Sequence, residues 1–493
     1  MRHLNPLSAS DCLPRLMSRS VRTEHDLLGD REVPSDVYYG VHTLRALENF
    51  PISGVPISRH SDLVVALATV KQAAAEANRQ LGMLDPAIAD AIVAACIEIR
   101  GGSLHDQFVV DQIQGGAGTS TNMNANEVIA NRALEILGFE RGDYHVVHPL
   151  EHVNLGQSTN DVYPTAVKVA LGVASRSLAR ALRGLVEYCS DKSYEFADML
   201  KLGRTQLQDA VPMTLGQEFG AFAVTIAEDA DRLDEACALI AEINLGGTAI
   251  GTGLNAHPEY AALVCDRLRD ITGLPVTTAG NLIEATSDVG SFVQLSGVAK
   301  RTAVKLSKIC NDLRLLSSGP RAGFGEINLP PVQAGSSIMP GKVNPVIPEV
   351  VNQVAFEVMG NDLTITVAAE AGQLQLNAFE PIIARALLSS LNHLTAAVNV
   401  LGERCIQGIT ANADRMRDAV LGSTSIATAL NPLVGYEAAT ALVAEAIATG
   451  TSIPELVRRS ALVDDAVLAR VLSVENLCWP NDPRGAMLQR ERS

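Results

Sequence analysis

Four short segments of this 493-residue chain are rich in small hydroxyl and amide side chains. They read GGAGTSTNMNANE (115–127), GQSTND (156–161), GRTQLQDAVPMTLGQE (203–218) and AGSSIMPGKVNP (334–345). Hydroxyls, amides and backbone N–H groups are donors that suit the oxygens of carboxylates. Lys342 follows a Pro-Gly pair and can bind one carboxylate as a point charge. The four segments together therefore favour a site for a small dicarboxylic acid.

The same side chains also have a structural interpretation. Long helical patterns separate the four segments, which places the segments at helix ends. Ser, Thr and Asn are the preferred residues at helix N-termini and in turns. Each segment by itself therefore fits a cap or turn, and this alternative applies to Thr119, Ser158, Thr205 and Ser336.

Motifs of several other kinds of site are missing. The GGAGTS stretch lacks the GK[ST] ending of a P-loop and the GxGxxG spacing of a dinucleotide site. Around Ser336 and Ser337 there is no GxSxG elbow of an esterase, and the chain has no HExxH metal motif. The sequence therefore disfavours phosphate binding, a hydrolase triad and a metal site.

Composition limits the partners of the chain. A net charge of −16 argues against nucleic acid and anionic membranes, which both call for a basic face. The eight cysteines include no CxxC spacing, which predicts reduced thiols in a cytoplasmic protein. Residues 1–22 lack the apolar region of a secretory signal, and we expect a flexible extension there.

Proline placement predicts a mainly helical protein. Five long proline-free runs are rich in Ala, Leu, Val and Glu, which favours five long helices. The runs are 164–212, 212–258, 275–320, 348–381 and 381–432. Within 214–243 and 289–316, apolar residues recur at helical steps of three, four and seven. Only 19% of the residues are charged, so we expect a bundle whose apolar faces exceed what one chain can cover, and hence self-association.

The segmentation of the chain predicts three domains after the extension. They are an N-terminal domain (23–158), a central helical-bundle domain (159–414) and a small C-terminal domain (415–493). In the first of these, residues 63–100 have a helical pattern and 101–126 are expected to be rich in loops.

The polar segments also carry a resemblance. AGSSIMPGKVNP resembles the signature GSSxMPxKxNP of the aspartase/fumarase superfamily, and segments 115–127 and 203–218 are similar to its other two shared regions. The resemblance extends from about Glu24 to Trp479. Within the superfamily, the stretches 27–50, 326–354 and 370–381 most resemble the aspartate ammonia-lyase family.

This resemblance implies a fold and a reaction. The fold would have a central five-helix bundle, and four subunits would form a homotetramer with a twenty-helix core and active sites composed from three subunits. The reaction would be the reversible deamination of L-aspartate to fumarate and ammonium. The alternatives are a class II fumarase acting on malate, a lyase of an N-substituted aspartate, and a non-catalytic relative of the crystallin kind.

Two positions bear on these alternatives. Fumarases carry His where this chain has Gln206, and a leaving hydroxide needs a proton that glutamine cannot supply near neutral pH. The residues after Pro345 are Val346 and Ile347, where class II fumarases usually have Thr-Gln. Both differences favour the ammonia-lyase, and the intact serines of the signature argue against a non-catalytic relative.

The resemblance also implies roles for ten residues. Ser336 would act as an alkoxide base, stabilised by loop N–H groups and by Lys342. The residues that would hold the β-carboxylate are Thr119, Ser158, Thr159 and Ser337. The α-carboxylate would be held by Lys342 and Asn344, and the amino group would lie near Asn160, Thr205 and Gln206. No cofactor would be required, although Mg²⁺ activates some members of the family.

Overall fold

The computed structural model describes residues 20–479, and the chain divides into two compact units. Unit 1 comprises residues up to 179 together with 231–303 and 356–394; unit 2 comprises 180–230, 304–355 and the residues from 395 onwards. Most of the predicted extension, residues 1–19, lies outside the described residues, and strand β1 begins at Val21. The division into three domains remains a prediction.

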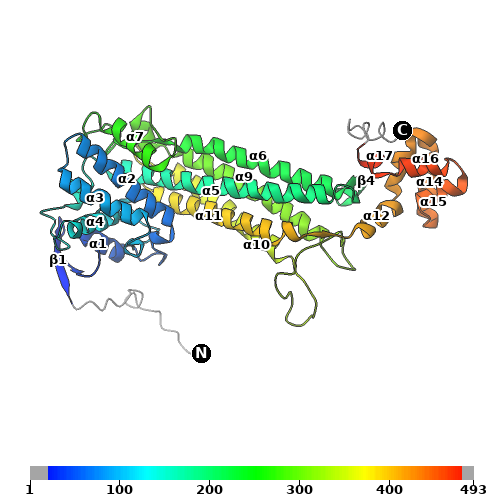
Figure 1. The fold of residues 1–493 in the computed structure, drawn as a ribbon, viewed down its shortest axis with the longest axis horizontal. Coiled ribbons are helices and arrows are strands. Elements are labelled where there is room, and N and C mark those ends of the chain that lie inside the picture. The colour runs from blue at the N-terminus through cyan, green and yellow to red at the C-terminus, as the bar shows by residue number, and fades with distance from the viewer. Residues whose placement is uncertain (1–19, 480–493) are drawn as a thin grey trace. The chain divides into compact units, whose positions relative to one another are not determined.

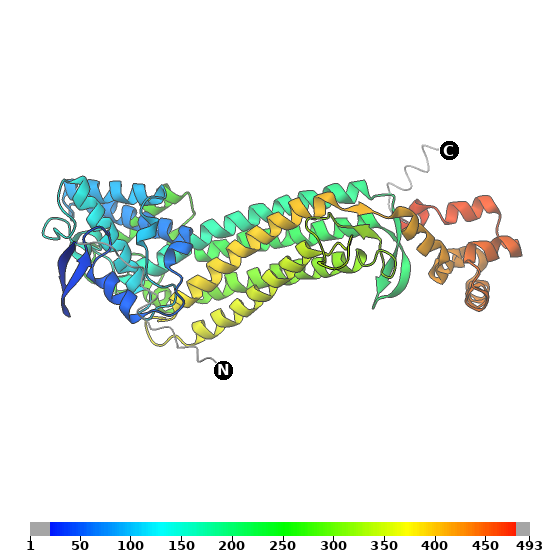
Figure 2. The ribbon, with the colours of Figure 1, turned by 90° about the horizontal axis from the view of Figure 1, so that it is seen from below.

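Five long helices confirm the prediction from proline placement (Figures 1 and 2). They are α5 (Thr159–Glu195), α6 (Leu215–Ile240), α9 (Gly290–Leu316), α10 (Val346–Glu370) and α11 (Glu380–Arg404). Each of them contributes residues to both units. In unit 1, Asp362 of α10 accepts hydrogen bonds from Ser296 Oγ (2.8 Å) and Lys300 Nζ (2.6 Å) of α9. In unit 2, Asn352 of α10 donates to Ser307 Oγ of α9 (2.8 Å).

Three of the five long helices, α5, α10 and α11, begin earlier than the proline-free runs suggest. Pro348 and Pro381 lie in the first turns of α10 and α11. Proline is tolerated there because the N–H groups of the first turn form no hydrogen bond within the helix. Pro164 is instead the sixth residue of α5, and its missing N–H leaves the carbonyl of Asn160 without a helical donor.

The N-terminal part of unit 1 is mostly helical. Strands β1 (Val21–Asp26) and β2 (Gly29–Pro34) pair antiparallel, and they precede α1 (Val41–Asn49), α2 (Ser61–Gln80), α3 (Pro86–Arg100) and α4 (Thr119–Ile136). The start of α4 occupies residues that we expected to be loop. The buried carboxylate of Glu127 on α4 accepts from the backbone N–H groups of Gly40 and His42 and from Thr43 Oγ1. This carboxylate fixes the start of α1 against α4.

Unit 1 also contains short elements between α6 and α9. Helices α7 (Tyr260–Thr272) and α8 (Leu282–Ser287) accompany a parallel pair of two-residue strands, β5 (Glu242–Ile243) and β6 (Thr277–Thr278). A glycine-rich turn, residues 244–253, follows β5. Asn244 and Gly246 of this turn form hydrogen bonds to Asn160 and Asp161 at the start of α5.

Unit 2 contains a β-hairpin and a group of short helices. The hairpin is β3 (Leu200–Thr205) and β4 (Gln208–Thr214), which pair antiparallel. The short helices are α12 (Ala413–Gly422), α13 (Asn431–Val434), α14 (Tyr436–Thr449), α15 (Ile453–Ser460), α16 (Asp465–Val471) and α17 (Val474–Cys478). Leu200 and Leu202 of the hairpin share a buried core with Leu430, Leu456 and Leu468 of this group. The strands β7 (Ile327–Asn328) and β8 (Thr410–Ala411) also pair antiparallel.

Between Ser20 and Trp479, no helix combines the length and the apolar character that a membrane crossing would need.

Candidate functional site

The N-termini of α4 and α5 meet in unit 1 because a glycine permits their close approach. Gly118 has φ of +91°, which L side chains rarely adopt. A Cβ atom at this position would lie 2.4 Å from Cγ of Tyr163 on α5. Glycine is therefore required at 118, and it brings Thr119 next to the segment that contains Ser158 and Thr159.

Two hydroxyls at the start of α5 are oriented as donors. Ser158 Oγ accepts from the backbone N–H of Asn160 (3.2 Å), and Thr159 Oγ1 accepts from Asn122 Nδ2 (3.1 Å). Within residues 20–479 neither hydroxyl proton has an acceptor, so both can be given to a ligand oxygen. Thr119 differs, because its Oγ1 donates to the carbonyl of Gly116 (2.7 Å). In this arrangement Thr119 offers a ligand lone pairs and no proton.

A buried carboxylate that the sequence analysis did not single out supports this segment. Asp161 Oδ1 accepts from the N–H of Ser158 (2.9 Å), and Oδ2 accepts from the N–H groups of Gly246 and Thr248 (both 3.0 Å). Burial raises the pKa of Asp161 to about 6, and the three backbone hydrogen bonds oppose that rise. The spacing of Ser158 and Asp161 is that of a capping box, and this signal could have identified the residue.

Lys71 is a second supporting residue that sequence reasoning missed. Its Nζ donates to Asn154 Oδ1 (2.8 Å) and Gln157 Oε1 (2.9 Å), directly before Ser158. Burial lowers the pKa of Lys71 to about 7. A lysine within a largely apolar stretch, VVALATVKQAAA, was the available sequence signal.

In unit 2, Thr205 and Gln206 lie at the exposed tip of the β3–β4 hairpin. Thr205 pairs with Gln208, so the turn consists of Gln206 and Leu207, with φ of +54° and +62°. Two-residue hairpin turns of this kind normally use Asn-Gly, because positive φ strains other residues. Backbone strain of this kind clusters at functional sites, which is consistent with a role for Gln206.

The base of the hairpin is held by buried charges. Glu326 accepts from Arg204 (2.6 Å) and pairs with Lys201 (3.0 Å), whose ammonium also bonds Glu218. The guanidinium of Arg204 lies 4.2 Å from the ring centre of Phe324. The stretch TQLQ contains none of the usual turn residues, so the sequence did not predict this hairpin.

The loop that precedes α10 is closed at its neck. The N–H of Gly335 donates to the carbonyl of Lys342 (3.0 Å), and Asn344 Nδ2 donates to the carbonyl of Gly335 (2.6 Å). A Cβ atom at 335 would lie 2.2 Å from Lys342 O, so the neck requires glycine. The amide of Asn344, which the resemblance assigns to the α-carboxylate, is engaged in this neck.

Ser336 lies just inside the neck, and its Oγ faces two donors. The backbone N–H groups of Ile338 (3.2 Å) and Met339 (3.0 Å) both donate to Ser336 Oγ. Two N–H groups aimed at one oxygen stabilise negative charge on it. Ser337 and Lys342 are exposed on the same loop, and among the described residues Lys342 Nζ has no hydrogen-bond or ion-pair partner.

The predicted site residues fall into two sets. Unit 1 contains Thr119, Ser158, Thr159 and Asn160, which the structure brings together. Unit 2 contains the hairpin residues Thr205 and Gln206 and the loop residues Ser336, Ser337, Lys342 and Asn344.

Comparison with known proteins assigns the family. The family model described as "Lyase" matches residues 29–360, and "Fumarase C C-terminus" matches 426–478. The chain belongs to the lyase family. This assignment confirms the resemblance drawn from the signature, and the mainly helical fold that it implied.

Relatives of this lyase cover nearly its whole length. The aspartate ammonia-lyase of Pseudomonas aeruginosa is 60% identical over 462 residues, which are 94% of this chain and 98% of the relative. A structure described as fumarate lyase:delta crystallin from Brucella melitensis, bound to cobalt, has a TM-score of 0.91 at 56% identity and covers 94% of this chain and 100% of that one. The class II fumarase of Schistosoma mansoni has a TM-score of 0.88 at 34% identity, again with 94% and 100% coverage.

Proposed function

We propose that this lyase is an aspartate ammonia-lyase, a carbon–nitrogen lyase that converts L-aspartate reversibly to fumarate and ammonium. Curated relatives with this name are 51–60% identical to the chain. The observation that carries the proposal is the environment of Ser336 Oγ, which accepts from two backbone N–H groups in a loop whose sequence, 334–346, contains no histidine. This environment suits a serine that removes a proton as an alkoxide.

The reaction requires removal of a proton from the β-carbon of aspartate, next to a carboxylate. Ser336 takes this proton on Oγ, and the electron pair of the C–H bond moves into the carboxylate to give an aci-carboxylate with two charged oxygens. The C–N bond of the protonated amino group then breaks as the electrons return, which forms the double bond of fumarate and releases ammonia. Ser336 gives up its proton to the ammonia or to solvent, which yields ammonium and restores the alkoxide. We assign to Lys342, on the same loop, the stabilisation of the alkoxide by its positive charge, since a nearby ammonium favours the anion.

The carboxylates of the substrate need donors whose protons are free. Ser158 and Thr159 have such protons, and they support binding of the β-carboxylate, where charge develops. Ser337 would complete that group, and Thr119 would join it once its hydroxyl turns away from the carbonyl of Gly116, to which it donates here. We assign the α-carboxylate to Lys342 and Asn344.

The amino group of the substrate would lie near the hairpin. Asn160, Thr205 and Gln206 are the residues that we assign to it. Gln206 has no proton to give near neutral pH, and ammonia leaves more readily than hydroxide, which favours the ammonia-lyase over the fumarase.

We further propose a homotetramer in which different copies of the chain complete each site. The residues of both sets are exposed or partly exposed at loop and helix ends, as expected for groups that meet across subunits. Helix α10 also exposes a row of apolar side chains: Phe356, Leu363 and Val367 are 60%, 66% and 58% exposed. Such a face is stable in water only when another apolar surface covers it.

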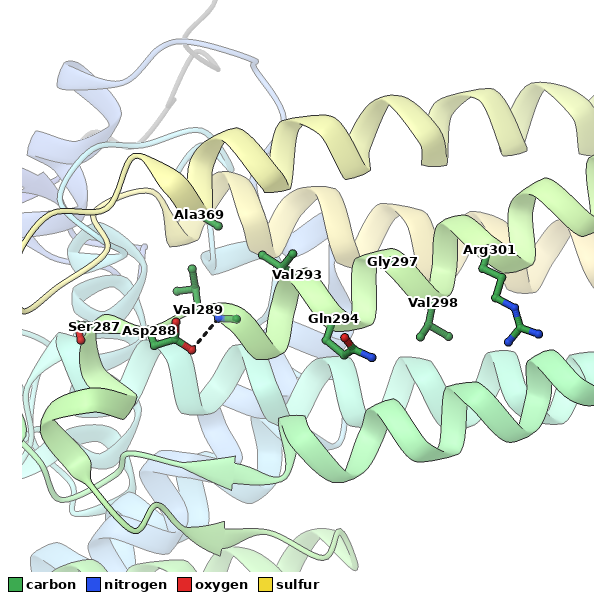
Figure 3. Close-up of a pocket in the computed structure, with 10 residues that line it drawn as sticks. Ser287, Asp288, Val289, Val293, Gln294, Gly297, Val298, Arg301 and Ala369 are labelled. Atoms are coloured by element: carbon green, nitrogen blue, oxygen red, sulfur yellow. Dashed lines mark hydrogen bonds between the residues drawn. The ribbon is translucent and has the colours of Figure 1, made fainter.

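A cavity along α9 supports the same proposal. It has a volume of 440 Å³ and is lined by Val293 and Val298 of α9, by two glycines at 290 and 297, and by Ala369 of α10 (Figure 3). Glycines on a helix face allow the side chains of another helix to approach closely. We infer that a helix of a second copy packs here.

We propose that the enzyme needs no cofactor and acts in the cytoplasm. In the part of the chain that the structure describes, no group of three or more His, Cys, Asp or Glu side chains is placed to hold a metal ion. Activation by Mg²⁺ is tested by adding the ion, or EDTA, to the assay.

The test is the rise in ultraviolet absorbance that fumarate produces, with purified protein given L-aspartate, L-malate or an N-substituted aspartate separately. The proposal predicts a rise with L-aspartate alone. A rise with malate would contradict our interpretation of Gln206, and a rise only with an N-substituted aspartate would favour that alternative.

A further inference from the structure

Within the described residues, the hydroxyl of Thr159 has one hydrogen-bond partner, a buried side-chain amide on α4. Asn122 is 1% exposed, and its Nδ2 lies 3.1 Å from Thr159 Oγ1 and 3.2 Å from Asn154 Oδ1. Its Oδ1 has no partner among the described protein atoms. The amide of Asn122 therefore acts here only as a donor, with one proton for each neighbour.

The direction of these hydrogen bonds is fixed by Lys71. The lysine Nζ donates to Asn154 Oδ1 at 2.8 Å, and Asn154 Nδ2 donates to the carbonyl of Gln157 at 3.2 Å. The orientation of the Asn154 amide is thus set on both sides. Its oxygen must face Asn122, and only the nitrogen of Asn122 can approach that oxygen without repulsion.

The orientation of the Asn122 amide also determines where the hydroxyl proton of Thr159 can point. Because the nitrogen of Asn122 faces Asn154, the second proton on the same nitrogen is directed at Thr159 Oγ1. The threonine oxygen then accepts, and its own proton must point elsewhere. In the described residues that proton has no acceptor, so it is available for a carboxylate oxygen of a ligand.

We propose that Asn122 is a positioning residue, which holds the hydroxyl of Thr159 with its proton directed at the substrate carboxylate. This inference rests on the proposed function, since it concerns the carboxylate that Thr159 would bind. Asn122 does not itself touch the substrate. It acts by restricting a freely rotating hydroxyl to the one orientation that donates, which lowers the entropic cost of binding.

Asn126 provides a matched control. It lies one turn further along α4, is fully buried and donates to the same Asn154 Oδ1 (3.3 Å), and its Oδ1 is likewise without a partner. It differs from Asn122 in having no contact with Thr159. A variant of Asn126 therefore reports the structural cost of losing an amide in this cluster.

The experiment is a double-mutant cycle on kcat/KM for L-aspartate. The variants are Asn122→Leu, Asn126→Leu, Thr159→Val and the Asn122→Leu/Thr159→Val double variant, each checked for the oligomeric state of the wild type. We expect Asn122→Leu to lower kcat/KM by about 3- to 10-fold, the value of one hydrogen bond, and Asn126→Leu to lower it less than about twofold. In the Thr159→Val background, Asn122→Leu should cause almost no further loss, because its partner is already absent.

Two results would overturn the proposal: equal losses for Asn122→Leu and Asn126→Leu, or losses that multiply in the double variant. Should Asn122→Leu fail to assemble, Asn122→Asp takes its place, because a carboxylate keeps the size of the side chain and cannot donate. We expect a larger loss for Asn122→Asp, since it would accept the proton of Thr159.

Calorimetric binding of succinate to the same variants separates this proposal from the proposed function. A wild type that binds succinate but does not turn over aspartate contradicts the ammonia-lyase, while the cycle on the Kd of succinate still tests Asn122. A wild type that neither binds succinate nor turns over aspartate contradicts both.

Discussion

Asn244 donates its side-chain amide to the backbone carbonyl of Asn160 at 2.9 Å, in the place of a helical N–H. Pro164 is four residues after Asn160 and has no N–H to give, so this carbonyl would otherwise be unpaired inside the protein. Asn160 in turn donates its own side chain to the carbonyl of Ala249 (2.7 Å). The turn after β5 therefore holds the first turn of α5 in place, together with three residues that we predict to contact the substrate.

The first prediction concerns this substitute hydrogen bond. Asn244→Leu should destabilise the protein by about 1–3 kcal/mol, because it leaves the partly buried carbonyl of Asn160 unpaired. Adding Pro164→Ala to this variant restores a helical N–H, and we expect part of the stability to return. Urea unfolding of the single and double variants measures both effects. Pro164→Ala alone is the control, and an equal gain in the wild-type background would show that Asn244 does not compensate for the proline.

The second prediction concerns the base. Ser336→Ala should lower kcat by about 10²–10⁴-fold, the usual contribution of a general base, and leave the oligomer intact. Ser337→Ala is the matched control on the next residue, and we expect a smaller loss that appears mainly in KM. Fumarate absorbance and sedimentation velocity are the measurements. Normal turnover in Ser336→Ala would remove the serine-base mechanism from consideration.

The third prediction concerns assembly. Leu363→Glu places a charge on the exposed apolar face of α10, which we propose to be covered by another copy of the chain. We expect species smaller than the wild-type oligomer in sedimentation, and activity that falls with the fraction of assembled protein. Ile97→Glu on α3, another exposed apolar position, serves as the control. Full activity in a monomeric Leu363→Glu would contradict active sites composed from several subunits.

The fourth prediction concerns pH. Burial raises the pKa of Glu380, the first residue of α11, to about 8, and Lys168 opposes the rise. Between the ordinary value of 4.5 and about 8, the folded state therefore holds a proton that the unfolded state releases, and stability falls as the pH rises. Glu380→Gln cannot titrate, so its apparent melting temperature should exceed that of the wild type at pH 8.5 and approach it at pH 5.

The control for this pH effect is Glu437→Gln, which changes an exposed acidic residue that likewise lies in the first turn of a helix, α14. We expect its melting temperature to follow the wild type at both pH values. A difference for Glu380→Gln that is the same at pH 5 and pH 8.5 would show that Glu380 does not titrate in this range.

The sequence by itself determined the helical architecture and the residue types of the site. Proline positions and helical periodicity identified the five long helices, because both depend on local backbone and packing rules. The signature AGSSIMPGKVNP identified the loop of Ser336 and the family, since its serines, glycine and lysine are adjacent in the chain. Local chemistry of this kind can be read without knowledge of the fold.

The tertiary structure decided which supporting groups hold these residues. Three side chains hold the start of α5: Lys71 from α2, Asn122 from α4 and Asp161 from α5 itself. The hairpin that carries Gln206 has no turn signal, and Arg204, two residues before its strained tip, pairs with Glu326 from a distant part of the chain. The direction of a buried hydrogen bond depends on which atoms meet from distant parts of the chain, and no local pattern in the sequence specifies that.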